Sequence, residues 1–86
     1  MELRDTVDMM SSEDYRERFK AEYYQTKIRY EKLKNFNNKI EAALRSSEIE
    51  MPKHDCPGEL LREQQAIMGK YLSLLEIRAL FEKIDL

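Results

Sequence analysis

The sequence has few of the residues that stabilise a small fold through disulfide bonds or a bound metal ion. It contains one cysteine, Cys56, and one histidine, His54. A lone thiol excludes an internal disulfide, and one Cys with one His cannot form a zinc cage within one chain. No apolar run approaches the roughly 20 residues that span a bilayer. The start, Met1 to Asp5, lacks the basic end and apolar run of a signal peptide. These absences predict a protein of a reducing cytoplasm with no membrane partner.

Neither sign of charge predominates in the sequence. Acidic, basic and neutral residues are mixed, with 37% charged residues and a formal net charge of only -2 over 86 residues. A chain-wide basic surface for duplex nucleic acid is therefore absent. The hydrophobic fraction of 42% is too high for a disordered tail. The length predicts one small unit, residues 1–86, with a single limited core.

Glycine and proline are absent from residues 13–45, and this stretch is predicted to be one long helix. Ser11 and Ser12 precede it as candidate N-caps, with Asp14 placed as in a capping box. Apolar and small polar residues recur inside it at alternating steps of four and three, the spacing of a seam against another helix. The seam contains Phe19, Tyr23, Thr26, Tyr30, Leu33, Asn37, Ile40 and Leu44.

Cations line the margin of this seam. At about 100° per residue they fall within roughly 40° of one another and alternate with Tyr23 and Tyr30. Ammonium and guanidinium groups bind phosphates, and tyrosine rings stack on bases, so the strip suits a phosphate-bearing aromatic ligand. The plainer interpretation is that these side chains solvate the seam or pair with nearby glutamates. The strip consists of Arg16, Lys20, Lys27 and Lys34.

Three further segments complete the predicted organisation. Residues 1–10 place apolar side chains at helical spacing and are predicted to form a short amphipathic helix or arm, with a frayed terminus as the alternative. Residues 46–57 form a loop, because Pro52 and the segment 53–58 combine turn formers with helix stops and starts. His54, Asp55 and Cys56 are interpreted as parts of this turn, and Asp55 or Cys56 as the cap of a second helix over residues 58–84.

The second helix carries more apolar surface than one partner helix can cover. The first row contains Leu60, Ile67, Tyr71, Leu74 and Phe81. The second row contains Leu61, Met68, Leu72, Leu75 and Ala79. One row is therefore left for another chain or for the N-terminal arm. Gly69, inside this helix, predicts that another group packs closely there.

These features predict an all-α fold: an antiparallel two-helix hairpin with a short N-terminal helical arm, assembling into a helical homo-oligomer. A chain of this size rarely holds together without disulfides, metal, association or unusually good packing. With disulfides and a metal cage excluded, association of hairpins is the expected solution.

Two stretches of the sequence carry a family resemblance. They are Leu60-Leu61-x-x-Gln64-x-x-x-Met68-x-x-Tyr71-Leu72-x-x-Leu75-Glu76-x-Arg78, and Lys20-Ala21-Glu22 followed by Arg29-x-Glu31-Lys32-Leu33. Together, over about two thirds of the chain, they resemble short prophage-encoded proteins, relatives of a crAss-like phage protein. That group is similar in hairpin pattern to the phage anti-CBASS and anti-Thoeris cyclic-nucleotide sponges.

The resemblance implies capture of a bacterial immune signalling nucleotide, a cyclic dinucleotide or a cyclic ADP-ribose isomer, without cleavage. It also implies oligomers with pockets between neighbouring hairpins, and phosphate contact by a lysine that corresponds to Lys20. The first helix of this chain is more aromatic than the family pattern, and its N-terminal arm does not match. These departures bear on which ligand is bound.

The leading functional interpretation is a non-enzymatic phage or prophage anti-defence protein in the host bacterial cytoplasm. Arg16, Lys20 and Lys27 would contact phosphates and Tyr23 or Tyr24 would stack on the ligand, at protomer interfaces, because a lone hairpin offers no concavity. The alternative is a helical protein–protein interaction module, a host-protein inhibitor or phage accessory adaptor, docking through the surplus apolar row. An enzyme is disfavoured, because the carboxylates lie on solvated helix faces, and no cofactor or metal site is expected.

Overall fold

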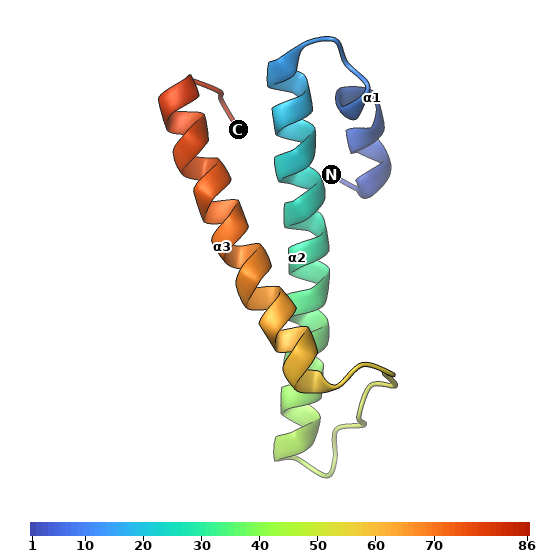
Figure 1. Cartoon of the computed structure of the whole chain (residues 1–86). Helices are drawn as coiled ribbons and strands as arrows, with labels where there is room; N and C mark the ends of the chain where they lie inside the picture. The colour runs from blue at the N-terminus through green and yellow to red at the C-terminus, as the bar shows by residue number, and fades with distance from the viewer.

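The computed structural model describes all residues, 1–86, and they form helices and loops with no strand. A 3-10 helix, η1 (Leu3–Thr6), runs directly into α1 (Val7–Met10). The long helix α2 spans Tyr15–Arg45, and α3 spans Gly58–Glu82 (Figure 1). The predicted all-α class is confirmed. None of these helices is both long enough and apolar enough to cross a bilayer.

The helices α2 and α3 form an antiparallel pair. Near the start of α2, the Tyr23 hydroxyl donates a hydrogen bond to the Glu76 carboxylate, near the end of α3. Further along α2, the Asn37 side-chain amide donates to the carbonyl of Leu61, near the start of α3, at 3.2 Å. The residue numbers of the partners on α3 therefore fall as those on α2 rise, which means that the two helices run in opposite directions.

The start of α2 is set by Asp14. Its side chain accepts a hydrogen bond from the backbone N–H of Arg16 at 2.9 Å, and its own backbone is extended. The expected serine caps are therefore wrong: Ser12 accepts a hydrogen bond from the Asp14 N–H instead, and Ser11 ends α1. An aspartate is also the better charge at this position, because the helix N-terminus carries positive partial charge.

The start of α3 also differs from the sequence-based expectation. Pro57, with φ -56°, is itself the N-cap, and neither Asp55 nor Cys56 caps the helix. The fixed φ of proline is already compatible with the helix that follows, so the chain can turn into α3 without a side-chain cap. His54 lies in the loop and meets the ring of Phe36 edge-on, with ring centroids 6.1 Å apart.

The end of α3 is a left-handed turn at Lys83, with φ 57° and ψ 43°. The backbone N–H of Ile84 donates to the carbonyl of Ala79 at 2.9 Å. This bond is that of a Schellman motif, in which the residue after the turn packs back onto the helix. The helix therefore stops at Glu82, before the expected end at residue 84, and Ile84 is folded into the core.

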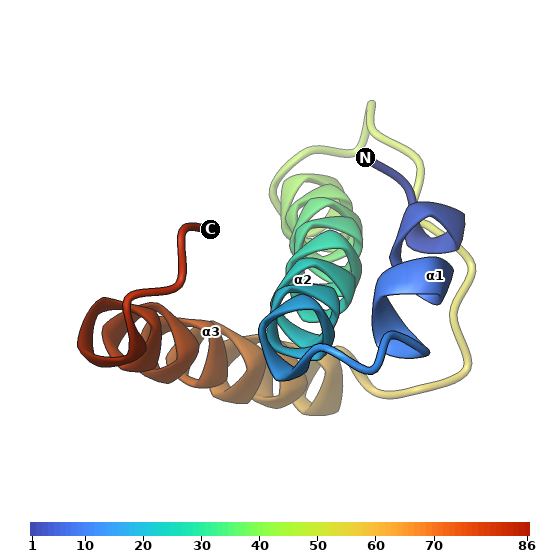
Figure 2. The ribbon, with the colours of Figure 1, turned by 90° about the horizontal axis from the view of Figure 1, so that it is seen from above.

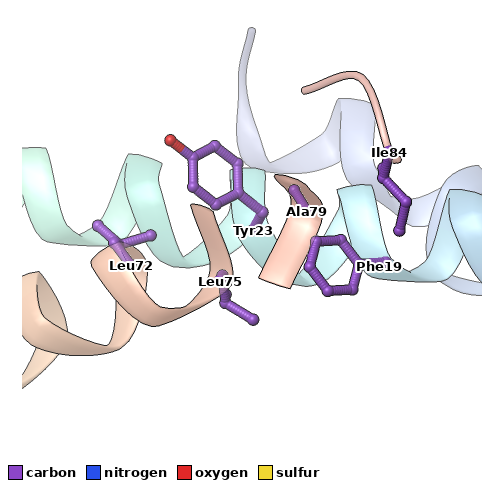
Figure 3. Packing of buried hydrophobic residues seen from close by; sticks show 6 residues of the cluster. All are labelled: Phe19, Tyr23, Leu72, Leu75, Ala79 and Ile84. Carbon is purple, nitrogen blue, oxygen red and sulfur yellow. The ribbon is translucent and has the colours of Figure 1, made fainter. Parts of the chain in front are cut away.

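The core between α2 and α3 is small, as expected for a chain of this length. Only 10 of 86 residues are buried, and Leu75 is the most deeply placed large apolar side chain, at 1% exposure. Most of the core lies toward the end of the hairpin opposite the loop; Leu44, expected in the seam, is exposed instead. The main cluster consists of Phe19, Tyr23, Leu72, Leu75, Ala79 and Ile84 (Figure 3).

The N-terminal arm, η1 and α1, packs on the side of α2 opposite to α3 (Figure 2). Thr6 of the arm and Ala21 of α2 are both fully buried. The Arg18 guanidinium donates to the carbonyl of Ser12 at 2.7 Å and ties the connection down. Because neither arm helix contacts α3, the arm does not cover the surplus apolar row.

That row is the first one, and it remains exposed. The second row faces α2: Leu72, Leu75 and Ala79 are buried, and the other two members are half-buried. The exposed fractions of the first row are 52% for Leu60, 62% for Ile67, 39% for Tyr71, 51% for Leu74 and 84% for Phe81.

Replacing Lys83 with glycine is expected to stabilise the fold. A left-handed backbone costs an L-residue roughly 1 kcal/mol that glycine does not lose, so the free energy of unfolding should rise by about that amount. Urea denaturation followed by circular dichroism measures it. The matched control is Lys39→Gly, at an exposed position inside α2, where loss of about 1 kcal/mol is expected. A Lys83→Gly protein less stable than the parent contradicts this account of the turn.

Candidate ligand-binding site

The structure spreads the predicted phosphate-binding cations along α2. Arg16 donates to the backbone carbonyls of Lys83 at 2.8 Å and Glu82 at 3.3 Å. The guanidinium thus satisfies carbonyls at the end of α3, where positive charge is favoured. From Arg16 to Lys27, α2 rises by about 16 Å, so these two cations do not meet one small ligand. In this structure Arg16 closes the hairpin.

Lys20 lies about one turn further along α2 than Arg16. Its ammonium is 3.7 Å from the Glu17 carboxylate, and its side chain is 29% exposed. Such partly exposed ion pairs are worth roughly 0–1 kcal/mol, so Lys20 can leave Glu17 for a stronger anion at little cost. It lines none of the cavities described below.

Tyr23 belongs to the core. Its ring is 5% exposed, and its hydroxyl donates to Glu76 at 2.5 Å. Burial, followed by this hydrogen bond, raises the pKa of Tyr23 to about 12 from 10.0. The ring also meets Tyr24 edge-on, with centroids 5.2 Å apart. Tyr23 is therefore not accessible for stacking on a base. Its ring instead packs against that of Tyr24.

Tyr24 and Lys27 do lie together, in the largest cavity of the molecule. This first groove has a volume of about 420 Å³ and runs along α2 beside the N-terminal arm. It combines an aromatic ring, two apolar side chains, an amide, a carboxylate and two lysine ammonium groups. Its lining residues are Met1, Tyr24, Lys27, Ile28, Glu31, Lys32 and Asn35.

A second groove lies on the other side of Lys27, between α2 and α3. Its volume is about 190 Å³, and Lys27 and Glu31 line both grooves. Tyr30 forms part of its wall and covers Gly69: a Cβ added at Gly69 would lie 3.3 Å from Tyr30 Cε1. The predicted close packing at Gly69 is confirmed. Lys27 is thus the cation that two adjoining grooves share, and its ammonium is 5.8 Å from the centroid of the Tyr23 ring.

The arm explains why the first groove exists. A two-helix hairpin was expected to have no concavity within one chain, and this expectation is wrong: α2 and α3 line the second groove by themselves, and Met1 of the arm adds a wall to the first groove beside α2. Lys32 and Asn35 were not identified from the sequence as residues of this groove. Both lie on the face of α2 turned away from α3, and no pattern in the sequence predicts that the arm docks beside that face.

A third cavity, of about 290 Å³, lies near the loop and includes His54 and Arg62. The Nδ1 atom of His54 is 2.8 Å from the carbonyl oxygen of Pro52, so the imidazole is held in the turn, as predicted from the sequence. Neither Asp55 nor Cys56 lines this cavity.

The fold defines a small all-helical hairpin protein with grooves along its central helix. Comparison with protein-family models identifies the family: residues 13–81 match Sequestin, and the chain belongs to the Sequestin family. The name of the family indicates a sequestering role. No curated protein and no solved structure matches the chain. The matched region covers α2, the loop and nearly all of α3, and it leaves out the arm that walls the first groove.

The raised pKa of Tyr23 generates a test of the core. Below pH 10 the tyrosine is neutral in both the folded and the unfolded chain. Between about pH 10 and 12 it ionises only when unfolded, so the free energy of unfolding should fall with pH in that range. Urea titrations at pH 9, 10, 11 and about 12 should show this fall, and Tyr23→Phe should reduce its slope. An unchanged slope in Tyr23→Phe contradicts this account of the core.

Proposed function

We propose that this protein sequesters a small immune signalling nucleotide, of the cyclic dinucleotide or cyclic ADP-ribose type, and holds it without cleaving it. The observation that carries the proposal is the first groove, where Tyr24 and Lys27, both singled out from the sequence, line a cavity of about 420 Å³. This volume falls within the roughly 300–1,000 Å³ of small-molecule sites. Membership of the Sequestin family supports a role in sequestration.

The chemistry of the groove matches such a ligand. Lys27 and Lys32 supply ammonium groups for phosphates, and Tyr24, held from behind by Tyr23, supplies a ring for a base. The Asn35 amide can donate to and accept from the edge of a base, and Glu31 can accept hydrogen bonds from ribose hydroxyls or exocyclic amines. Binding is stoichiometric and requires no group that breaks bonds.

The biological setting of the proposal rests on the sequence resemblance to prophage proteins and phage sponges. The protein would act in the host bacterial cytoplasm as a phage anti-defence factor and lower the free concentration of the signal. It would do so as a homo-oligomer, in which Lys20, which lies outside the grooves of one chain, can meet a ligand held by a neighbouring protomer.

One observation favours an alternative function, a helical protein–protein interaction module. The first row of α3 exposes apolar side chains such as Ile67 and Phe81 that a host protein or phage partner could cover. In that case nucleotides leave the thermal stability of the protein unchanged, and one host protein is recovered with it in stoichiometric amount.

Isothermal titration against a panel of cyclic dinucleotides and cyclic ADP-ribose isomers tests the leading proposal. One member is expected to bind, and Lys27→Ala should raise its Kd about tenfold through loss of a charged phosphate contact. Lys39→Ala, an exposed lysine of α2 outside the grooves, is the matched control and should leave the Kd unchanged. The absence of heat with every member of the panel contradicts the proposal.

The stacking role of Tyr24 is tested in the same titration. Tyr24→Phe keeps the ring and should bind nearly as the parent does, whereas Tyr24→Ala should weaken binding about tenfold or more. The ligand released from the complex by heat should elute unchanged in chromatography, which checks that it is held and not cleaved. Equal affinities of the Phe and Ala variants contradict the stacking role.

A further inference from the structure

The first row of α3 is the most prominent exposed apolar surface of the chain. Leu60, Ile67, Leu74 and Phe81 follow one another at intervals of seven residues, and each is at least half exposed. With Tyr71 they occupy an arc of about 80° on the helix. A strict seven-residue repeat is the spacing of a helix that packs along another helix, because it keeps one side of the helix facing its partner.

No other part of the chain lies against this row. Only α2 contacts α3, and it does so through the second row. If each member of the first row exposes on the order of 100 Å², the row supplies about 500 Å² per chain and roughly 1,000 Å² when two copies meet, the lower bound of a specific interface. The row is therefore large enough to be covered by its own copy.

Charged residues border the row along one edge. Glu63 and Lys70 both lie on this edge, about one and three turns from Leu60, and both are exposed. The other edge carries Gln64 and Arg78, with no acid among the exposed positions between them that could pair with Arg78 of another copy. Because this edge holds one acid and one base seven residues apart, it can pair with the same edge of a second copy that runs antiparallel: the acid of each copy then meets the base of the other.

We propose that two copies of this chain pair through the first row, with their α3 helices antiparallel and Ile67 on the two-fold axis. Leu60 of each copy then faces Leu74 of the other. Glu63 of each copy lies beside Lys70 of the other, so that two identical ion pairs border the apolar contact. This pairing is isologous, because each copy presents the same surface to the other.

Charge selects this arrangement over the other ways of aligning the repeat. In an antiparallel pair, like edges meet, and a shift that sets Ile67 against Leu74 places the two Lys70 side chains opposite each other. In a parallel pair, unlike edges meet, and Glu63 then lies beside Gln64 of the other copy and makes no ion pair. Of these symmetric arrangements, only the register centred on Ile67 pairs acid with base.

The paired row and the grooves occupy different sides of α3. Gly69, Ser73 and Glu76, which line the second groove, lie more than about 100° around the helix from the centre of the row. The dimer therefore leaves both grooves open. It supplies one interface of the homo-oligomer in the proposed function and rests on that function only in this respect. It is tested without ligand, so its failure and the failure of nucleotide binding are separate results.

Sedimentation equilibrium at micromolar concentration tests the interface. The parent protein is expected to be a dimer and Leu74→Glu a monomer, with a dissociation constant raised at least 100-fold, because the row then carries a buried charge. Leu44→Glu places the same charge on an exposed leucine of α2 outside the row and should remain dimeric. Circular dichroism should show parent helix content in both variants. A monomeric parent, or a dimeric Leu74→Glu, overturns the proposal.

Cross-linking under oxidation tests the direction and register, in a background with the exposed Cys56 replaced by serine. Ile67→Cys alone should form a disulfide across the two-fold axis. Leu60→Cys alone should not, because the two sulfurs would be about 20 Å apart, whereas Leu60→Cys with Leu74→Cys should give a covalent dimer. A dimer linked by Leu60→Cys alone means parallel pairing and overturns the antiparallel register.

Discussion

The structure depends on the packing of α2 on two opposite sides. On one side Phe19 and Tyr23 meet α3 around the buried Leu75, and on the other the fully buried Ala21 lies under the arm. Where α2 lies between α3 and the arm, its exposed surface is divided into strips between the two contacts. Lys27 stands on one of these strips, which is why it borders two grooves at once. The position of the candidate site is thus a consequence of the packing.

Much of the fold could be predicted from the sequence, because periodicity reports which side of a helix is covered. The seam of α2 was predicted correctly at Phe19, Tyr23 and Ile40, which are buried. The two apolar rows of α3 separate as expected into one covered and one exposed. Close packing at Gly69 was predicted because glycine destabilises a helix interior and is expected there only where a neighbour leaves no room for a side chain. That neighbour is the ring of Tyr30.

The features that the sequence did not predict depend on single backbone angles or on long-range docking. The left-handed turn at Lys83 uses a residue that rarely adopts it, so no glycine marked the end of α3. The guanidinium of Arg16 binds carbonyls that reach it only after this turn forms. The first groove, with Lys32 and Asn35, requires the arm to dock beside α2, and the arm has only a few apolar residues to indicate where it packs.

The family match begins at residue 13, so the arm lies outside the segment that the match defines. The cluster formed by Phe19, Tyr23, Leu75 and their neighbours contains no residue of the arm. Substitutions near Met1 can therefore reshape one wall of the groove without disturbing the folding of the hairpin. This separation places the arm's part of the groove wall outside the hairpin, so that this wall can change in shape while the packing of the two long helices stays the same.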